Sequence, residues 1–488
     1  MQLKNWGLWG LVAVGLIGMG TTYYVHQRPT TMMGTNGAHG MMMGRTTSTK
    51  STATSTTAHQ MALPPLLKPT RQTTQQVAYT VTAQRGKMAF YQGQKTNTLG
   101  YNGNYLGPVL QVNRGQTLKI KTQNHLTTTT SFHWHGLVLP GVDDGGPNQT
   151  VAAGQTKTVQ FKIKQPAATL WFHPHAMGST AKQVYQGLAG LIYVRDAASQ
   201  KRHLPQTYGV NDFPVIIQDR QFTADHQLDY EQAYQADGTT GSTLLVNGTV
   251  NPYLNVTTKL VRLRLVNGSN ARNYRLTLSN GQAMQQIATD GGLLPHPVAV
   301  KTVRLSPGER AEVVIDTARF KTGQSVTLQN GHQQVLALRT AKHLKTDGRL
   351  PATLTTLPKV STANAQHQSL TFSGMGHMVA INHQTYQRNR INLTAQVKRP
   401  QVWTIRNTSG MMGGMIHPFH LHGVQFRILS INGATPPANQ RGWKDTVALP
   451  PDGEVKIAFT FKDKGIYMYH CHNLEHEENG MMGQIKVS

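Results

Sequence analysis

The chain is organised around the segment His470-Cys471-His472-Asn473-Leu474-Glu475-His476-Glu477-Glu478-Asn479-Gly480-Met481-Met482, which holds the only cysteine among 488 residues. The apolar and aromatic run 465–469 precedes it and predicts a strand that leads into the cysteine. Because successive side chains of a strand point to opposite faces, we expect Cys471 to face one way and His470 and His472 the other. One strand could therefore serve two different sites.

The side chains of this segment are typical ligands of a blue-copper electron-transfer site. Such a site uses a thiolate, two imidazoles and a weak axial thioether, and Cys471, His476 and Met481 supply three of these four ligands. Met482 is the alternative axial ligand. A lone buried cysteine is more often a small core residue, but the other histidines of the chain favour a metal site.

Eight of those histidines form four His-x-His pairs. Residues i and i+2 of a strand project from the same face, so each pair can offer two imidazoles to neighbouring metal ions. Two pairs lie early in the chain and two lie late, and neither half could hold three metal ions alone. We therefore expect one cluster between two domains, built from His133, His135, His173, His175, His420, His422, His470 and His472. His417 is left over and would complete the blue site.

An all-β fold is predicted from Val77 onward, where short runs of alternating apolar and polar residues are broken by Gly, Pro, Asn and Asp. A weak repeat, in which an alternating strand ends in asparagine, occurs at 104–124, 247–267 and 382–407. Three copies about 140 residues apart predict three similar β-sandwich domains. Their expected ranges are 77–200, 201–345 and 366–488. The middle domain has no His-x-His pair, and we interpret it as a spacer and partial wall.

The N-terminal region has a different composition. Residues 6–19 are strongly apolar and no residue between Lys4 and His26 is charged, so residues 1–26 predict a secretory signal or a membrane anchor. Residues 27–76 are rich in Thr, Ser, Met and Gly and predict a flexible stalk without a core. Soft methionine ligands at 32–33 and 41–43 could capture Cu(I), although such clusters can also be compositional noise. A single cysteine in an exported chain fits a metal ligand better than a structural residue.

The net charge of the chain restricts the classes of partner that we expect it to bind. The chain has 47 Lys and Arg against 21 Asp and Glu, for a net charge of +26. Its basic residues are scattered and no nucleic-acid motif is present, so we expect no nucleic-acid partner. Anionic polymers of a cell envelope fit the charge and the export signal. The sequence thus favours an extracytoplasmic protein at the bacterial envelope, and we expect a monomer.

Taken together, the four histidine motifs resemble those of the multicopper oxidases, the family of laccases, bilirubin oxidases and bacterial cuprous oxidases. The resemblance runs from about Val77 to Ser488. It implies three cupredoxin domains and four copper ions: one type 1, one type 2 and a type 3 pair. By motif position, the type 1 ligands would be His417, Cys471, His476 and Met481, and the type 2 ligands His133 and His420. The type 3 ligands would be His135, His173, His175, His422, His470 and His472.

The resemblance also implies a reaction, in which four one-electron oxidations are coupled to the reduction of O2 to two waters. Asp144 and Glu477 match acidic positions that deliver protons in bacterial members, although a turn-forming residue and a solvated charge are the simpler interpretations. The segment 373–382 resembles copper-efflux cuprous oxidases, but residues 343–370 lack their methionine-rich insertion.

Three functions follow from this comparison, and we rank them. Laccase-like oxidation of phenols and aromatic amines comes first, because the methionine-rich insertion is missing. Dedicated Cu(I) oxidation comes second, with Met411, Met412 and Met415 as possible docking residues. A non-catalytic copper-binding envelope protein comes last, because every expected copper ligand is present.

Overall fold

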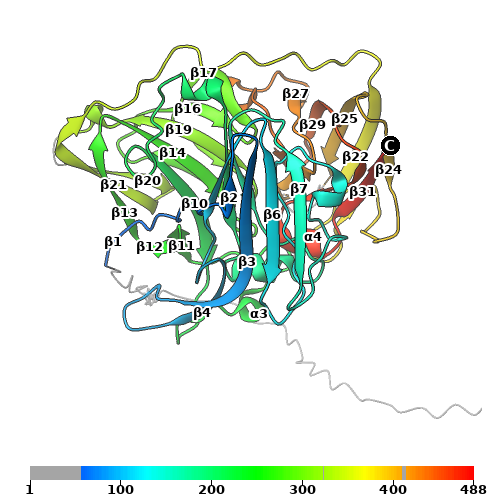
Figure 1. Ribbon diagram of the computed structural model, residues 1–488, viewed down its shortest axis with the longest axis horizontal. Helices are drawn as coiled ribbons and strands as arrows, with labels where there is room; N and C mark the ends of the chain where they lie inside the picture. Colours follow the sequence, from blue (N-terminus) through cyan, green and yellow to red (C-terminus); the bar gives the residue numbers. More distant parts are fainter. Residues whose placement is uncertain (1–56, 322–323, 409–413) are drawn as a thin grey trace, which may run out of the picture. The chain divides into compact units, whose positions relative to one another are not determined.

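Paired strands are the main regular structure and build three β-sandwiches. The computed structural model describes residues 57–321, 324–408 and 414–488. Within these ranges the strands form six sheets, two in each sandwich. In Figure 1 the first sandwich is mainly blue to cyan, the second is mainly green to yellow-green and the third is yellow to red. The predicted all-β fold with three sandwich domains is confirmed.

The first sandwich has a larger and a smaller sheet. The larger sheet has the order β2 (Arg71–Gln72), β3 (Gln76–Met88), β6 (Thr117–Asn124), β7 (Thr156–Lys162), with β4 (Thr96–Tyr101) paired to β3. The smaller sheet has the order β5 (Val109–Asn113), β9 (Gly190–Arg195), β8 (Ala168–Phe172). The buried strand β8 leads directly to the His173 pair.

The second sandwich contains the most strands. One sheet has the order β1 (His59–Gln60), β13 (Pro252–Thr258), β21 (Gln333–Lys345), β20 (Ser325–Asn330), β15 (Tyr274–Leu278), β18 (Val303–Leu305). The other has the order β12 (Thr249–Val250), β11 (Thr243–Val246), β10 (Asp212–Arg220), β14 (Leu260–Asn267), β19 (Arg310–Asp316), β16 (Met284–Thr289), β17 (Gly292–Val300). No strand or helix lies between residues 346 and 365, which connect this sandwich to the third.

The third sandwich carries the cysteine. One sheet has the order β23 (Ala380–Ile381), β22 (Gln366–Ser373), β25 (Pro400–Asn407), β29 (Glu454–Thr460), β27 (Arg427–Ile431). The other has the order β24 (Leu393–Ala395), β31 (Met482–Val487), β30 (Gly465–Cys471), β26 (His417–Leu421), β28 (Thr446–Leu449). The strand predicted before Cys471 is thus β30, and the antiparallel pair β26–β30 places His420 opposite His470.

The three sandwiches share one local arrangement. Strands β6, β14 and β25 each pair in parallel with an earlier strand and antiparallel with a later one. Each ends in an asparagine, Asn124, Asn267 or Asn407, whose side-chain amide donates to two backbone carbonyls. The asparagine therefore satisfies carbonyls where the strand ends and the chain turns.

Helices are short and few among the described residues. The α-helices are α1 (Thr180–Tyr185), α2 (Ala197–Gln200), α3 (Tyr230–Ala233) and α4 (Leu474–Glu478), and the 3-10 turns are η1 (Gly141–Asp143), η2 (Thr317–Arg319) and η3 (Ala438–Gln440). Helix α4 lies between the cysteine and Met481, and it packs near α1 of the first sandwich. None of the helices in the described ranges is long and apolar enough to cross a membrane.

The N-terminal arm, residues 57–76, differs from the expectation. We predicted a flexible stalk over residues 27–76, but β1 pairs in parallel with β13, and Met61 is buried in the core of the second sandwich. Leu66 also forms a bridge with Val109 of the first sandwich. The stalk prediction is therefore wrong for residues 57–76, because alternating contacts with two domains order a segment of weak local propensity. Its remainder and the segment 1–26 lie outside the described residues.

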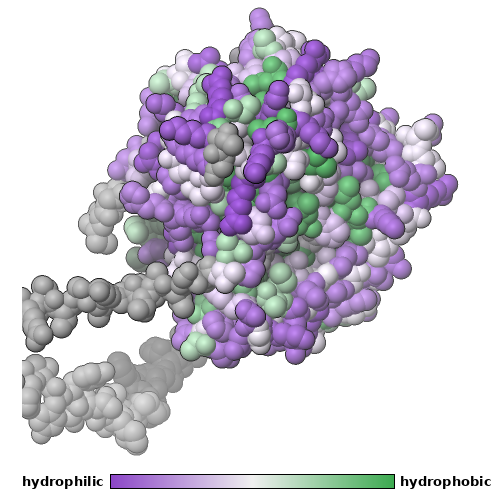
Figure 2. All heavy atoms as spheres, turned by 90° about the vertical axis from the view of Figure 1, so that its left-hand side faces the viewer, coloured by the Kyte–Doolittle hydropathy of each residue, from purple (hydrophilic) through white to green (hydrophobic). Residues whose placement is uncertain are grey.

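Each sandwich has its own apolar core, and Cys471 and Met481 belong to that of the third. The surface contrasts with these cores. On the face shown in Figure 2, hydrophilic residues predominate and interrupt the hydrophobic ones. That distribution fits the high net charge of the chain.

Candidate metal centres

The first candidate centre surrounds the only cysteine. Cys471 ends β30, His417 begins β26 and His476 lies on α4. The Nδ1 atoms of His417 and His476 lie 3.5 Å and 3.8 Å from the Cys471 Sγ and 3.3 Å from each other. All three side chains are buried. A cysteine sulfur and two imidazoles thus converge on one point, as a blue-copper site requires.

The two methionines of this loop differ in direction. Met481 lies in the same apolar cluster as Cys471. Its backbone N–H donates to the His476 carbonyl at 2.9 Å. Met482 is the β31 residue opposite His470. Directly opposed residues of an antiparallel pair project to the same face, so Met482 shares the face of His470 and not that of Cys471. The geometry favours Met481 as the thioether near the cysteine.

The second candidate centre is a cluster of all eight His-x-His histidines, which are buried. Backbone hydrogen bonds in both directions hold His133 beside His173. The His470 Nε2 lies 3.2 Å from the His175 Nε2 and 3.0 Å from the His422 Nε2. Imidazoles of the first and third sandwiches therefore meet directly, as the sequence predicted.

Strand β30 and the residue after it connect the two centres. His470 and His472 contribute to the eight-histidine cluster, whereas Cys471 between them contributes to the other centre. Cys471 is the direct sequence neighbour of both histidines, so a single peptide unit links it to each of them. The two centres therefore lie on opposite faces of one strand.

The electrostatics of both centres favour neutral imidazoles. Burial lowers the pKa of His173 and His476 to about 3, and of His417 and His470 to about 4. Burial also raises the pKa of the Cys471 thiol.

Several ring nitrogens in these centres have no hydrogen-bond partner, among them Nε2 of His133 and Nε2 of His420. A buried polar nitrogen without a partner is costly, and a metal ion would satisfy it. Neutral imidazoles and a thiol are also the groups that copper binds. The donor set therefore fits copper.

Two carboxylates reach the eight-histidine cluster from opposite ends of the chain. The Asp144 Oδ2 lies 2.6 Å from the His422 Nδ1 and 3.6 Å from the His133 Nδ1. The Glu477 carboxylate lies between His175 and His470, at 3.2 Å and 3.3 Å from their Nδ1 atoms. Burial raises the pKa of both acids.

Comparison with known proteins identifies the family. Sequence models of the multicopper oxidases match three successive parts of the chain, residues 82–199, 211–342 and 349–488. The chain is 46% identical over 410 residues to the multicopper oxidase mco of Staphylococcus epidermidis, covering 84% of this chain and 88% of that protein. The chain belongs to the multicopper oxidase family. It is therefore an oxidase with copper cofactors, and members of the family use O2 and reducing substrates.

Solved structures agree with this assignment to the multicopper oxidases. A laccase from Pediococcus acidilactici superposes with a TM-score of 0.86 and 41% identity, covering 88% of this chain and 94% of that one. The three sandwiches are accordingly cupredoxin-like domains. The cell division protein FtsP of Salmonella typhimurium is also similar, at 35% identity over 84% of this chain and 89% of that protein.

Sequence reasoning missed one acid beside the histidines of this multicopper oxidase. Asp445 is fully buried, and its Oδ1 lies 3.0 Å from the His135 Nε2 and 3.7 Å from the His420 Nδ1. Its partner is Arg310 from the middle domain. The interpretation of that domain as a spacer and partial wall was therefore incomplete. The only sequence signal is a charged pair, Lys444-Asp445, directly before a strand with buried residues.

Most of the methionines that the sequence suggested for Cu(I) lie outside the described residues. Residues 32–33 and 41–43 lie outside the described ranges, as do Met411 and Met412. Met378 is 84% exposed, in the loop that follows β22. The adjacent His377 is exposed, and its Nδ1 lies 3.2 Å from the Asn479 Oδ1, two residues before Met481.

Proposed function

We propose that this multicopper oxidase is laccase-like and couples one-electron oxidation of phenols and aromatic amines to the reduction of O2 to water. The balanced reduction is O2 + 4 H+ + 4 e−, which yields two waters, and each reductant molecule supplies one electron. Four copper ions would supply the redox chemistry, one at the cysteine centre and three at the eight-histidine cluster. The residues hold these ions, separate the two half-reactions and move protons.

The cysteine centre would hold the type 1 copper, with His417, Cys471, His476 and Met481 as ligands. Its three donor groups are already within 4.8 Å of one another. Strands β26 and β30 and helix α4 position these ligands. It would take electrons one at a time from an organic reductant.

The eight-histidine cluster would hold the type 2 copper and the type 3 pair. We assign the type 2 copper to His133 and His420, whose Nε2 atoms lack partners. One type 3 copper would be held by His175, His422 and His470, which form a compact buried group. The other would be held by His135, His173 and His472, whose ring centroids lie 5.0–5.6 Å apart.

Asp144 and Glu477 would deliver protons to the cluster. Asp144 contacts the His422 ring nitrogen, and the Glu477 carboxylate lies beside the ring nitrogens of His175 and His470. The reduction consumes four protons for each O2, and both acids are buried beside the place where they are needed. Each would hold and release a proton at a carboxylate oxygen.

One observation carries the proposal: the buried Cys471 meets two imidazoles, while its neighbours His470 and His472 belong to the histidine cluster. The test is to load the purified protein with copper, measure bound copper and follow oxygen uptake with phenols, aromatic amines, Fe(II) and Cu(I). We expect a blue protein with about four copper ions that oxidises phenols fastest. Oxygen uptake with Cu(I) or Fe(II) alone would contradict the laccase-like assignment.

Cu(I) oxidation is the second candidate. The exposed Met378 and His377 favour it, because a thioether and an imidazole suit Cu(I) and lie near the segment of Met481. In the same assay, Met378→Leu should slow uptake with Cu(I) and leave uptake with a phenol unchanged. Equal rates with Cu(I) for both forms would remove this candidate.

We also propose an extracytoplasmic location, on the basis of the apolar N-terminal segment and the single cysteine. Fractionation of the native host, with detection of the protein outside the cytoplasm, would test this location.

A further inference from the structure

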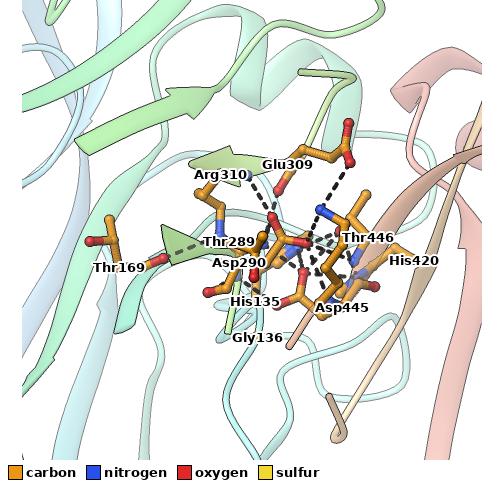
Figure 3. A network of polar contacts seen from close by, with 12 residues as sticks. His135, Gly136, Thr169, Thr289, Asp290, Glu309, Arg310, His420, Asp445 and Thr446 are labelled. Carbon is orange, nitrogen blue, oxygen red and sulfur yellow. Dashed lines mark hydrogen bonds and ion pairs between the residues drawn. The ribbon is translucent and has the colours of Figure 1, made fainter. Parts of the chain in front are cut away.

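The polar network in Figure 3 joins the middle domain to the histidine cluster. At its centre, the Asp445 Oδ1 lies 3.0 Å from the His135 Nε2 and accepts from the Thr446 hydroxyl at 3.0 Å. The Thr446 Oγ1 also lies 3.1 Å from the His135 Nε2 and 3.1 Å from the His420 Nδ1. Two adjacent side chains thus contact histidines of both the first and the third domain.

Those two histidines are tightly packed. The rings of His135 and His420 stack with centroids 3.7 Å apart and planes 12° apart. Asp445 and Thr446 contact one ring nitrogen of each histidine. The other ring nitrogen of each histidine is then free to face the cluster. For His135 that other atom is Nδ1, which lies 3.4 Å from the His173 Nε2.

Arg310 of β19 holds the Asp445 carboxylate. Its two terminal nitrogens donate to the two carboxylate oxygens at 2.6 Å each, a bidentate pair that fixes the plane of the carboxylate. The same guanidinium donates to backbone carbonyls of Thr169, Gly308 and Asp290. Arg310 is 1% exposed and Asp445 is fully buried, so solvent does not compete for this pair.

The surrounding charges support this pair. Lys444 donates to Asp290 at 2.9 Å and to Glu309 at 3.0 Å, while the backbone N–H of Arg310 donates to Asp290 at 2.7 Å. Three acids therefore face two cations, which leaves one net negative charge in the network. The Asp445 carboxylate can accept a hydrogen bond from a protonated Nε2 of His135. This hydrogen bond fixes the tautomer in which the His135 Nδ1 has a free lone pair.

Close packing leaves no room for an alternative arrangement. A Cβ on Gly136 would lie 2.5 Å from the Asp445 Oδ2 and 2.6 Å from an Arg310 nitrogen. A Cβ on Gly308 would lie 2.9 Å from the His472 ring. Both glycines also have positive φ, at 87° and 84°, where a side chain is strained. The turn before β19 thus packs directly on the histidine cluster.

We propose that Arg310 and Asp445 are positioning residues of the copper cluster, an inference that rests on the proposed function. Arg310 orients the Asp445 carboxylate, which together with Thr446 fixes the tautomer and ring orientation of His135. The Asp445 backbone carbonyl, at 2.8 Å from the Nδ1, and Thr446 do the same for His420. Asp445 itself is no metal ligand, because Arg310 occupies both of its oxygens and places a positive charge beside them. The middle domain therefore sets the geometry of a site whose ligands all come from the other two domains.

Arg264 offers a matched control for Arg310. It lies on β14, the neighbour of β19, and is buried like Arg310. It also makes a bidentate pair with an aspartate, Asp212, at 2.6 Å and 2.7 Å, and it contacts Thr169. No histidine is in contact with Asp212 in the described network. A lysine at either position keeps the charge and loses the planar fork.

The experiment compares the native protein with R310K, D445N and R264K, each loaded with copper and dialysed against a chelator. The measurements are bound copper, the electron paramagnetic resonance spectrum of type 2 copper, the blue absorption and thermal unfolding of the copper-free forms. We expect R310K and D445N to bind cluster copper about 10- to 100-fold more weakly, with an altered type 2 spectrum and an unchanged blue band. R264K should keep native copper affinity and spectra at a comparable loss of thermal stability.

Native copper affinity and a native type 2 spectrum in both R310K and D445N would overturn the proposal. The same would follow if R264K lost cluster copper as R310K does, since the effect would then be general loss of stability. If R310K does not fold, D445N and T446V carry the test with the same two outcomes. A native protein that binds no copper at the cluster would instead contradict the proposed function, and the native sample measures this separately.

Discussion

At the scale of single residues, the chemistry of the cysteine centre depends on one sulfur. Cys471 is fully buried between His417 and His476, and burial raises the pKa of its thiol. A bound copper ion would have to stabilise the thiolate against this burial. The same sulfur would then be the source of the blue colour and of the electron path to the cluster.

Cys471→Ser should abolish the blue band and the oxidation of phenols, because a hydroxyl does not replace a thiolate as a copper ligand. The eight-histidine cluster should keep its copper, since Cys471 contributes nothing to it. Copper analysis with absorption and oxygen uptake would measure this, and we expect about three copper ions in place of four. A variant that stayed blue would show that the ligand assignment is wrong.

The choice between Met481 and Met482 can be tested in the same way. Met481→Leu should keep the protein blue and active but raise the reduction potential of the type 1 copper, because a weak axial donor is lost. Met482→Leu is the matched control, and it should leave the potential near the native value since this residue faces the side of His470. Redox titration of the blue band would measure both. A shift in Met482→Leu alone would reverse the assignment.

Proton delivery is a third property of single residues. Asp144→Asn and Glu477→Gln should keep the copper content and the colour, while turnover falls by roughly 100-fold, the scale of general acid catalysis. Reduction of the blue band by substrate without O2 should stay near normal, because electrons arrive at the other centre. Stopped-flow measurement of reduction and of reoxidation by O2 would separate the two.

Asp143→Asn is the control for these acids, because Asp143 is the more exposed neighbour of Asp144 in the same turn and contacts no histidine in the described network. Its turnover should be native. Loss of copper in Asp144→Asn and Glu477→Gln would show that both acids are structural supports of the cluster, and normal turnover would assign protons to another route.

At the scale of elements, the N-terminal arm of residues 57–76 joins two domains. Met61 inserts into the core of the second domain at 4% exposure, and the Ala62 carbonyl accepts from the Asn247 amide at 2.9 Å. The arm then crosses to Val109 of the first domain. It is therefore an interdomain support, and none of the histidines of the two candidate metal centres lies in it.

Met61→Ala should lower the free energy of unfolding by about 2–5 kcal/mol, the usual cost of truncating a large buried apolar side chain. Leu63→Ala is the control within the arm, because Leu63 is 39% exposed and should change stability little. Thermal unfolding of the copper-free proteins would measure both, and the blue band of the loaded proteins should be native. Equal stability for the two variants would contradict the role of the arm.

At the scale of the whole molecule, the buried histidines make stability depend on pH. The pKa of His173, His417, His470 and His476 lies at about 3 to 4 in the folded state, below the ordinary value of about 6.5. Below pH 6.5 the unfolded chain therefore binds more protons than the folded chain. The copper-free protein loses stability as the pH falls from about 6.5 toward 4, by at most about 1.4 kcal/mol per pH unit for each histidine.

Bound copper should reduce this loss, because it binds the folded ligands and not the separated ones. Unfolding temperatures of copper-free and copper-loaded protein between about pH 8 and pH 5 would show the difference. We expect a falling curve for the first and a flatter, higher one for the second. A flat curve for the copper-free protein would mean that these histidines are accessible to protons in the folded state.

The sequence alone predicted the all-β class, three sandwich domains and the candidate ligands. These features are local: a period of two places His470 and His472 on one face and Cys471 on the other, and a unique cysteine among histidines restricts the chemistry. The cluster between the first and third domains was predicted because each of these domains has only two His-x-His pairs, too few for three metal ions. These predictions required no knowledge of tertiary contacts.

Only the tertiary structure decided which distant residues support those ligands. Asp445 and Arg310 are 135 positions apart, and each is an ordinary charged residue until β19 and β28 bring them together beside His135. The ordered structure of the arm 57–76 also depends on tertiary contacts. Its contacts with two domains outweigh its weak local preference for any structure. Side-chain contacts between domains depend on strand register and packing, which no local pattern of residues encodes.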